Sequence, residues 1–403
     1  MNKLFISNKK FRLFLIAVIF SNAGDYIDDI AFAQLVYLIT NSTLFSSYVF
    51  AIKILFSIFS IFSATLADKL SKKKILVFSC LSQGILIVTL LLAYEYNFLT
   101  SPLLMAFVTL QAIFSSFSKP AQNAILPLIV KKEELIEARS LIGISDQLIQ
   151  IFSYLGAAAL ISQIGIMGAL IFDIISFFTM AILFQLIKIE DTIIPIKSIS
   201  SFFKNVKEGF IFIKHKQVII VILLLTFGGN FLVTPLDTLM PAYTSQMQYP
   251  ATYFSLYMMF IAIGGVIGGT ITSRFRKLVP IGFLFSLGYL LGALSLLLLT
   301  FRIDIVFFIS SICMGLSIAI ISILNASIIQ ILTPKEMSAR IFAIFKCISF
   351  TASPLGILIA GMLGEIILMN CVYLIYGIMM LILTCISFKY CRINQKEIFS
   401  EES

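Results

Sequence analysis

The sequence has 403 residues, of which 60% are hydrophobic and 12% are charged. A mean hydropathy of +1.05 excludes a water-soluble globular protein and indicates an integral membrane protein. The net charge of +9 would suggest nucleic-acid binding in a soluble chain, but the basic residues gather in alternate connections between apolar runs, which argues against that class.

Apolar runs follow one another along the whole chain. About 20 residues cross a bilayer as a helix, and a helix satisfies its own backbone polar groups, whereas no alternation typical of a membrane β-barrel persists. The first run is long and contains aspartates, so we do not interpret it as a cleaved signal peptide. We predict an all-α membrane protein with twelve transmembrane helices near residues 12–39, 44–67, 75–95, 102–126, 140–163, 166–187, 218–240, 251–272, 279–300, 304–330, 341–366 and 370–390.

The basic residues lie in every second connection between spans. In the opposite connections, Arg302 is the only basic residue. By the positive-inside rule the basic side is cytoplasmic, so both termini are predicted to lie there. We expect a multi-pass protein embedded in the lipid bilayer of the plasma or inner membrane. The basic connections fall within residues 3–12, 69–74, 131–139, 188–216, 274–277, 335–340 and 389–396.

Two charged connections recur about 200 residues apart. Residues 64–74 and 269–277 both lie between apolar runs, and residues 127–139 and 334–340 end in Glu-Ala-Arg and Ser-Ala-Arg. Such a duplication is typical of secondary transporters. It predicts two pseudo-symmetric six-helix halves, 1–187 and 218–403, the second with a short tail, joined by a cytoplasmic connection at 188–217.

The central connection has an amphipathic helical pattern that favours a helix at the membrane surface. Its apolar residues recur at helical spacing, and lysines fill the positions between them. His215, the single histidine, lies between two lysines, and we interpret it as a surface residue rather than a proton relay. The apolar positions are Phe203, Val206, Phe210 and Ile213.

The connection after the second span resembles the signature of the major facilitator superfamily, in which an aspartate and a basic residue lie between two glycines and precede a basic cluster. Asp68 and Lys69 match, whereas Ala64 and Ser71 replace the glycines. The resemblance implies transport by alternating access. It also implies a gating role for Asp68 and the cations of both copies, which are Lys69, Lys72, Lys73, Lys74, Arg274 and Arg276.

Other stretches resemble the branch of drug and siderophore exporters that includes macrolide efflux proteins and the enterobactin exporter. Gln122 departs from that branch, which usually has arginine there, and Lys119 lies three residues earlier. The resemblance implies that spans one, four, seven and ten line a central cavity, to which the second half would contribute Asn230, Thr234 and Asn325. The matching stretches are Gly24-Asp25, residues 40–42, 120–127, 208–209 and 330–334, and Arg340.

Three carboxylates lie near the middle of the first span. Asp25, Asp28 and Asp29 have i, i+3 and i+4 spacing, which places them on one helical face. Each charge costs a few kcal/mol in hydrocarbon, on the order of 2.5 to 3.5, so the face should look into the bundle or a water-filled cavity. Mutual repulsion favours proton binding by at least one of them, which makes them candidates for proton coupling and for contact with a cationic substrate.

A structural role is the alternative for these charges. Lys53 lies at a depth similar to that of Asp28 and Asp29, so it could pair with one of them. Lys119 could balance Asp25 or Asp68 and gate the cytoplasmic side. Asp173, in the sixth span, is interpreted as a hydrogen-bonding residue between helices.

The remaining motifs favour neither an enzyme nor an ATP-driven pump. Six scattered cysteines form no Cys-x-x-Cys pair, no phosphate-binding loop occurs, and Gly264, Gly265, Gly268 and Gly269 indicate close helix packing. We expect no cofactor and no metal. We predict a monomeric, proton-coupled exporter of amphipathic small molecules such as macrolides; the alternatives are a siderophore or peptide exporter of the same fold, a non-transporting receptor and a channel.

Overall fold

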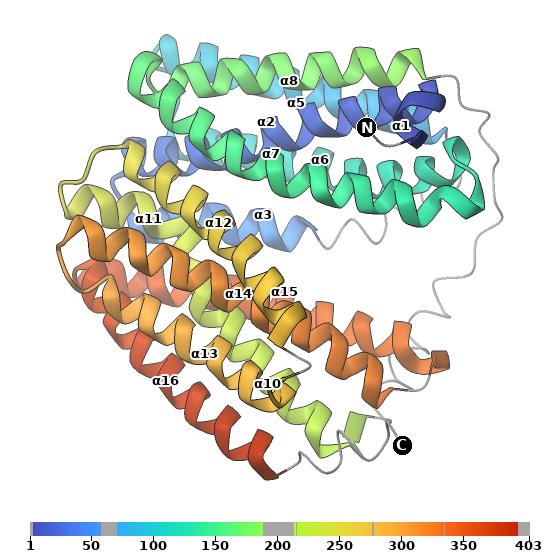
Figure 1. Cartoon of the computed structure of the whole chain (residues 1–403). Coiled ribbons are helices and arrows are strands. Elements are labelled where there is room, and N and C mark those ends of the chain that lie inside the picture. Colours follow the sequence, from blue (N-terminus) through green and yellow to red (C-terminus); the bar gives the residue numbers. More distant parts are fainter. Residues whose placement is uncertain are drawn as a thin grey trace. The chain divides into compact units, whose positions relative to one another are not determined.

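The computed structural model describes residues 3–57, 71–187, 213–214, 216–275, 278–333 and 335–393, and these ranges contain helices but no strand (Figure 1). Contacts divide the helices into two units. The first unit holds the helices up to α8 and the start of α12, and the second holds α10, α11, the rest of α12 and the helices that follow.

The helices of the first unit are α1 (Lys3–Ser7), α2 (Lys9–Thr40), α3 (Thr43–Ser57), α5 (Lys72–Glu95), α6 (Ser101–Ile129), the short 3₁₀ helix η1 (Lys132–Glu134), α7 (Leu135–Ile164) and α8 (Ile166–Leu186). Those that follow are α10 (Gln217–Val233), α11 (Pro235–Gln246), α12 (Thr252–Phe275), α13 (Ile281–Leu298), α14 (Asp304–Leu332), α15 (Lys335–Ile366) and α16 (Met369–Ile393).

The helices agree with the predicted spans. Within the described ranges, 10 helices have the length and apolar composition of a membrane span, with α10 and α11 counted as one. α2 and α3 are not among these 10 helices. α2 has 32 residues but carries charges at its start and in its middle, and α3 is described only up to Ser57. With α2 and α3 added, the helices correspond one for one to the twelve predicted spans, and the all-α membrane fold is confirmed.

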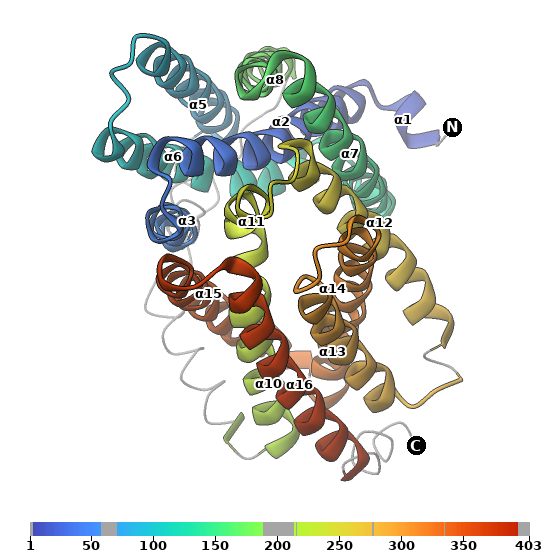
Figure 2. The same ribbon diagram turned by 90° about the vertical axis from the view of Figure 1, so that its left-hand side faces the viewer.

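α2 is the central helix of the first unit, where it packs against α8, α7 and α3. Figures 1 and 2 both show α2 and α8 side by side. Phe14 and Phe184 meet edge to face, with ring centroids 5.9 Å apart. Asn8 fixes the start of α2, because its side chain accepts from Phe11 N and donates to Ile129 O at the end of α6. This packing buries most of one face of α2 along its length.

The second unit is organised around α13, which packs against α14 and α16. Its core is aromatic: Tyr243 stacks on Phe307 at 6.1 Å and donates a 2.7 Å hydrogen bond to Leu299 O. α12 and α14 approach through glycines. A Cβ on Gly264 would lie 2.5 Å from Ile312 O, and a Cβ on Gly315 would meet Ile261 O.

The seventh predicted span, residues 218–240, corresponds to one span in which the helix is interrupted between α10 and α11. α10 ends at Val233 and α11 begins at Pro235, because proline has no N–H to donate to the Phe231 carbonyl one turn earlier. Gly356 of α15 lies against that carbonyl oxygen, where a side chain could not fit. Tyr376 of α16 donates to Gly356 O at 3.0 Å, so two neighbouring helices pack around the break.

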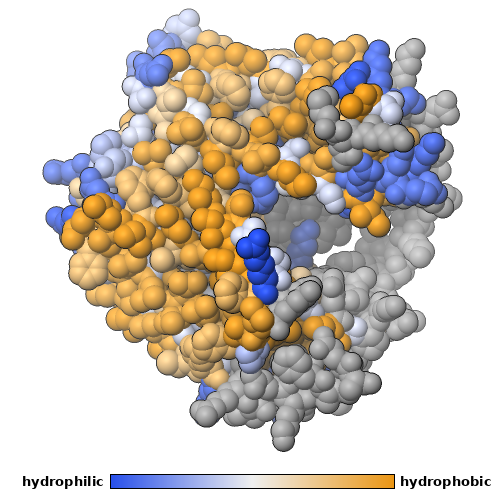
Figure 3. Space-filling model, viewed as in Figure 1, coloured by the Kyte–Doolittle hydropathy of each residue, from blue (hydrophilic) through white to orange (hydrophobic). Residues whose placement is uncertain are grey.

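Apolar side chains cover the outside of these helices, as expected for contact with lipid. In Figure 3 they dominate the region over α13 and α16. Exposed examples on these two helices are Phe283, Leu294, Ile378, Met379 and Ile382. Among the predicted features, most of the amphipathic helix of the central connection, together with His215, lies outside the described residues.

Candidate functional site

The three aspartates of α2 have different surroundings, although they lie within little more than one helical turn. Asp28 is 5% exposed, Asp25 is half-buried and Asp29 is exposed. The spacing i, i+3, i+4 spreads over about 100° of helix circumference, which is wide enough to aim neighbouring side chains at different helices. The face predicted from the sequence is therefore split between the packed interior and the open side of the unit.

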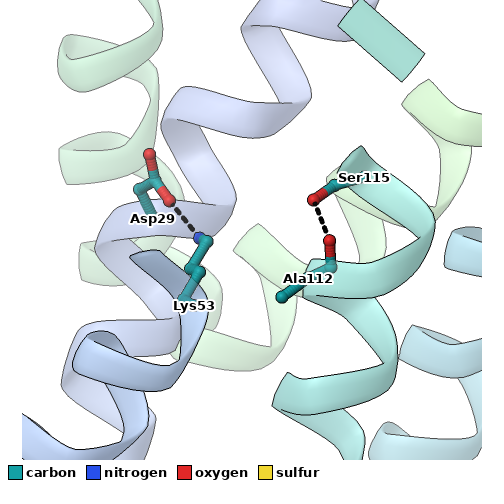
Figure 4. A network of polar contacts seen from close by, with 4 residues as sticks. All are labelled: Asp29, Lys53, Ala112 and Ser115. Atoms are coloured by element: carbon teal, nitrogen blue, oxygen red, sulfur yellow. Dashed lines mark hydrogen bonds and ion pairs between the residues drawn. The ribbon is translucent and has the colours of Figure 1, made fainter. Parts of the chain in front are cut away.

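Asp29 forms an ion pair with Lys53 of α3. Lys53 Nζ lies 2.6 Å from Asp29 Oδ1, and Figure 4 shows the two side chains pointing toward each other from their helices. The side chains are 31% and 51% exposed, respectively. Of the two aspartates considered as partners of Lys53, the structure pairs it with Asp29, which leaves Asp28 without that hydrogen bond. Ser115, in the same view, donates to Ala112 O of its own helix at 3.1 Å.

Asp28 has a buried oxygen with no hydrogen-bond partner among the described residues. Within the described part of the chain, nothing donates to its Oδ1. The charges of Lys53, Asp29 and Asp25 all act on this carboxyl. Burying a polar group without a partner costs about 1 to 3 kcal/mol, and more for a charged group, so Asp28 is an expensive residue to keep in the interior of a helical unit.

Asp25 lies among several charges. Lys119 of α6 exerts the strongest interaction on it, and Asp29, Lys53 and Asp146 also contribute. Lys119 itself is exposed. The structure therefore places Lys119 within electrostatic reach of Asp25, one of the two partners considered for it. The other, Asp68, lies outside the described residues.

Asp146 of α7 belongs to this group, although the sequence analysis did not single it out. Its Oδ1 accepts a 2.7 Å hydrogen bond from Asn22 Nδ2 and a 3.0 Å hydrogen bond from Tyr26 Oη, both on α2. Tyr26 also meets the ring of Tyr154 edge to face at 5.5 Å. A charge inside an apolar run was the available signal, and it is the same signal that drew attention to Asp173.

Asp173 of α8 is fully buried against α2. A Cβ on Gly24 would lie 2.5 Å from Asp173 Oδ1 and would also meet Ser176 Oγ, so this glycine makes room for the carboxyl. Ser176 Oγ lies 2.8 Å from the Asp173 carbonyl oxygen and 3.1 Å from Oδ1. Oδ2 has no hydrogen-bond partner among the described residues. Among the described residues, the hydrogen bond to the Asp173 carboxyl comes from Ser176 of its own helix, and not from a neighbouring helix as predicted.

The charged residues with a predicted gating role are placed in part. Asp68, Lys69 and Arg276 lie outside the described residues. Lys73 Nζ donates to Gln185 O at 2.6 Å and to Ile187 O at 3.0 Å, so it caps the C-terminal end of α8. The other three cations of this group occupy helix ends: Lys72 is buried, whereas Lys74 and Arg274 are exposed.

The polar residues predicted for the second half hold helices together. Asn230 Nδ2 of α10 donates to Ser349 Oγ at 3.3 Å, and Thr234 Oγ1, between α10 and α11, donates to Ser353 Oγ at 3.0 Å, so this segment and α15 share two polar contacts one turn apart. Asn325 of α14 is half-buried, and no described residue donates to its Oδ1. Among the described residues, no three His, Cys, Asp or Glu side chains are grouped so that they could hold a metal ion.

The family model of the Major Facilitator Superfamily matches residues 14–353. Macrolide efflux protein A of Streptococcus pyogenes is 24% identical over 351 residues, which cover 84% of each chain. The Staphyloferrin A transporter of Staphylococcus aureus is 25% identical over 272 residues, which cover 64% of this chain and 65% of that protein.

Solved structures show the same fold at low sequence identity. The nucleoside transporter NupG matches with a TM-score of 0.77 at 12% identity, over 94% of this chain and 98% of NupG. An inward-facing bacterial homologue of the iron transporter ferroportin matches with a TM-score of 0.75 at 15% identity, over 97% and 100%. The family match, which spans most of the sequence, and the helical fold lead to one conclusion: the chain belongs to the Major Facilitator Superfamily and is a multi-pass membrane transporter of small molecules, not an enzyme.

Proposed function

We propose that this transporter exports amphipathic small molecules, cationic drugs such as macrolides among them, in exchange for protons. The observation that carries the proposal is the carboxyl group of Asp28, buried in α2 with an oxygen that no described residue hydrogen-bonds. Burial of such a carboxyl costs little free energy only when the group is neutral, so it binds a proton readily. When the proton leaves, a positive charge must take its place.

Binding and release of this proton would couple proton movement to export of the substrate. Asp25 and Asp29 add negative charge beside Asp28, while Lys53 is held by Asp29 at 2.6 Å. When the site is deprotonated, this excess of acids favours a cationic cargo, and protonation favours its release. The names of the macrolide efflux relatives, which are 24% identical, agree with such cargo.

The wider arrangement is part of the same proposal. The halves 1–187 and 218–403 would alternate access as a monomer in the cell membrane, with both termini and the connection at 188–217 in the cytoplasm. Asn230, Thr234 and Asn325 would contribute to the cavity wall. The two copies of the charged connection would gate the cytoplasmic side. The first copy contains Asp68, Lys69, Lys72, Lys73 and Lys74, and the second contains Arg274 and Arg276.

A siderophore exporter is the second candidate, because the staphyloferrin A transporter is 25% identical over 272 residues. An anionic cargo would need cations, and Lys119 is the exposed cation that acts on Asp25. The two candidates therefore assign different charges of the first unit to the substrate. Macrolide export uses the aspartates, and siderophore export uses Lys119.

The test is proton movement in proteoliposomes with an imposed pH gradient. We expect the amine-bearing macrolide erythromycin to dissipate the gradient with the natural chain, and one of Asp25→Asn, Asp28→Asn or Asp29→Asn to abolish this. Asp304→Asn, at the exposed start of α14 in the second unit, is the matched control and should behave as the natural chain. If staphyloferrin A moves protons and erythromycin does not, the siderophore candidate replaces the macrolide one.

A further inference from the structure

Asp173 is a second buried carboxyl for which the proposed coupling mechanism has no role. It comes from α8 rather than α2, and its carboxyl lies against Gly24, where a Cβ would be 2.5 Å from Oδ1. Gly24 and Asp28 are four residues apart in α2, so they lie on one face, one turn from each other. The close approach at Gly24 thus brings Asp173 next to the turn of α2 that carries Asp28.

The carboxyl groups of Asp28 and Asp173 both lack solvent and a hydrogen-bond partner for one oxygen among the described residues. Asp28 is 5% exposed and Asp173 is 0% exposed, and each has one oxygen with no partner among the described residues. The other oxygen of Asp173 lies 3.1 Å from the Ser176 hydroxyl, a neutral group. Two adjacent carboxylates in a water-poor interface cannot both be charged, because each lacks solvent and each repels the other.

The charged residues that act on Asp173 come from α2 and α3. Asp28 acts most strongly on Asp173, followed by Asp25, and Lys53 is the cation that acts on it. Lys53 is already bonded to Asp29 at 2.6 Å. Asp146, from α7, is bonded to Asn22 and Tyr26. α5, which packs on α8, carries the buried polar side chains Cys80 and Gln83, and Gln83 donates to Ser79 of its own helix.

We infer that Asp173 is a proton-carrying residue of the first unit, which holds a proton together with Asp28 across the contact between α2 and α8. Exposure decreases stepwise from Asp29 through Asp25 and Asp28 to Asp173. Asp28 is the more exposed of the two and exerts the strongest charge interaction on Asp173, so the proton reaches Asp173 by way of Asp28. The role of this proton in transport rests on the proposed function, whereas its presence does not.

Infrared difference spectroscopy on the full chain in lipid nanodiscs tests for the proton without any substrate. A protonated carboxyl has a C=O stretch that carboxylates lack and that shifts in D₂O. At neutral pH we expect this band in the natural chain, a weaker band at a shifted frequency in Asp173→Asn, where Asp28 alone can hold the proton, and a shifted frequency in Asp28→Asn. Asp146→Asn is the matched control, because Asp146 is half-buried and accepts two hydrogen bonds, and it should leave the band unchanged.

A band that neither falls in Asp173→Asn nor moves in Asp28→Asn overturns the inference. If Asp173→Asn does not accumulate as folded protein, Asp28→Asn and Ser176→Ala read out the same band, and Ser176→Ala should also shift it because the hydroxyl lies 3.1 Å from Oδ1.

In proteoliposomes, Asp173→Asn should lower erythromycin-driven proton movement at least tenfold. A weakened band in Asp173→Asn together with full proton movement would overturn the coupling role. A natural chain that shows the band but moves no protons would refute the proposed function and leave the proton assignment standing.

Discussion

Lys73, one of the cations with a predicted gating role, also caps the C-terminal end of α8. Its ammonium group donates to Gln185 O at 2.6 Å and Ile187 O at 3.0 Å, where the last carbonyls of α8 have no partner within the helix. We expect Lys73→Ala to lower the free energy of unfolding by about 1 kcal/mol, because the helix end loses a cation and two hydrogen bonds. Thermal unfolding in detergent measures this change.

Lys74→Ala is the control for Lys73, since Lys74 is the next residue and is exposed. It should unfold at the temperature of the natural chain. If instead Lys73→Ala unfolds unchanged and transport stops, the contact with α8 is a gate rather than a cap.

Helical spacing and depth in the membrane were sufficient to predict which charged residues belong to the candidate site, but not which of them pair. Charges in apolar runs identified Asp25, Asp28 and Asp29, and counting from the connection at 40–43 placed Lys53 level with two of them. Spacing alone could not assign Lys53 to Asp29 rather than Asp28, because adjacent residues of a helix point about 100° apart. Asp146 was overlooked because its partners, Asn22 and Tyr26, lie on another helix.

At the scale of the helix, α12 shows which of two overlapping glycine pairs forms a close contact. A Cβ on Gly264 would lie 2.5 Å from Ile312 O of α14, whereas nothing lies within 4 Å of one on Gly265. We expect Gly264→Ala to destabilise the protein by about 1 to 3 kcal/mol, because backbone atoms of α14 must move. Gly265→Ala should be neutral or stabilising by up to about 1 kcal/mol, since alanine is the better helix former.

These neighbouring substitutions are compared by thermal unfolding in the same detergent. Equal effects would show that α12 and α14 do not approach at Gly264. The sequence predicted close packing from the Gly-x-x-x-Gly pattern, but Gly264 and Gly265 point in directions about 100° apart, and only the position of α14 decides which one is covered. The interruption at Pro235 was not predicted, although a proline within an apolar run is the sequence signal for one.

At the scale of the whole chain, hydropathy was sufficient to predict the helices because each one must satisfy its backbone polar groups within the bilayer. The alternation of basic and uncharged connections then predicts the orientation. The connection between α5 and α6 should be extracellular, and the connection between α12 and α13 should be cytoplasmic. Phe98 and Leu278 represent these two connections, and they are 72% and 78% exposed.

We expect Phe98→Cys, in a chain whose six native cysteines are replaced by alanine, to react with a membrane-impermeant maleimide in intact cells. Leu278→Cys should react only after the membrane is opened, because the basic residues beside it, Arg274 among them, favour the cytoplasmic side. The reverse pattern would place both termini outside. Reaction of both cysteines in intact cells would contradict the twelve-span topology, because an odd number of crossings, those of α6 to α12, separates the two positions.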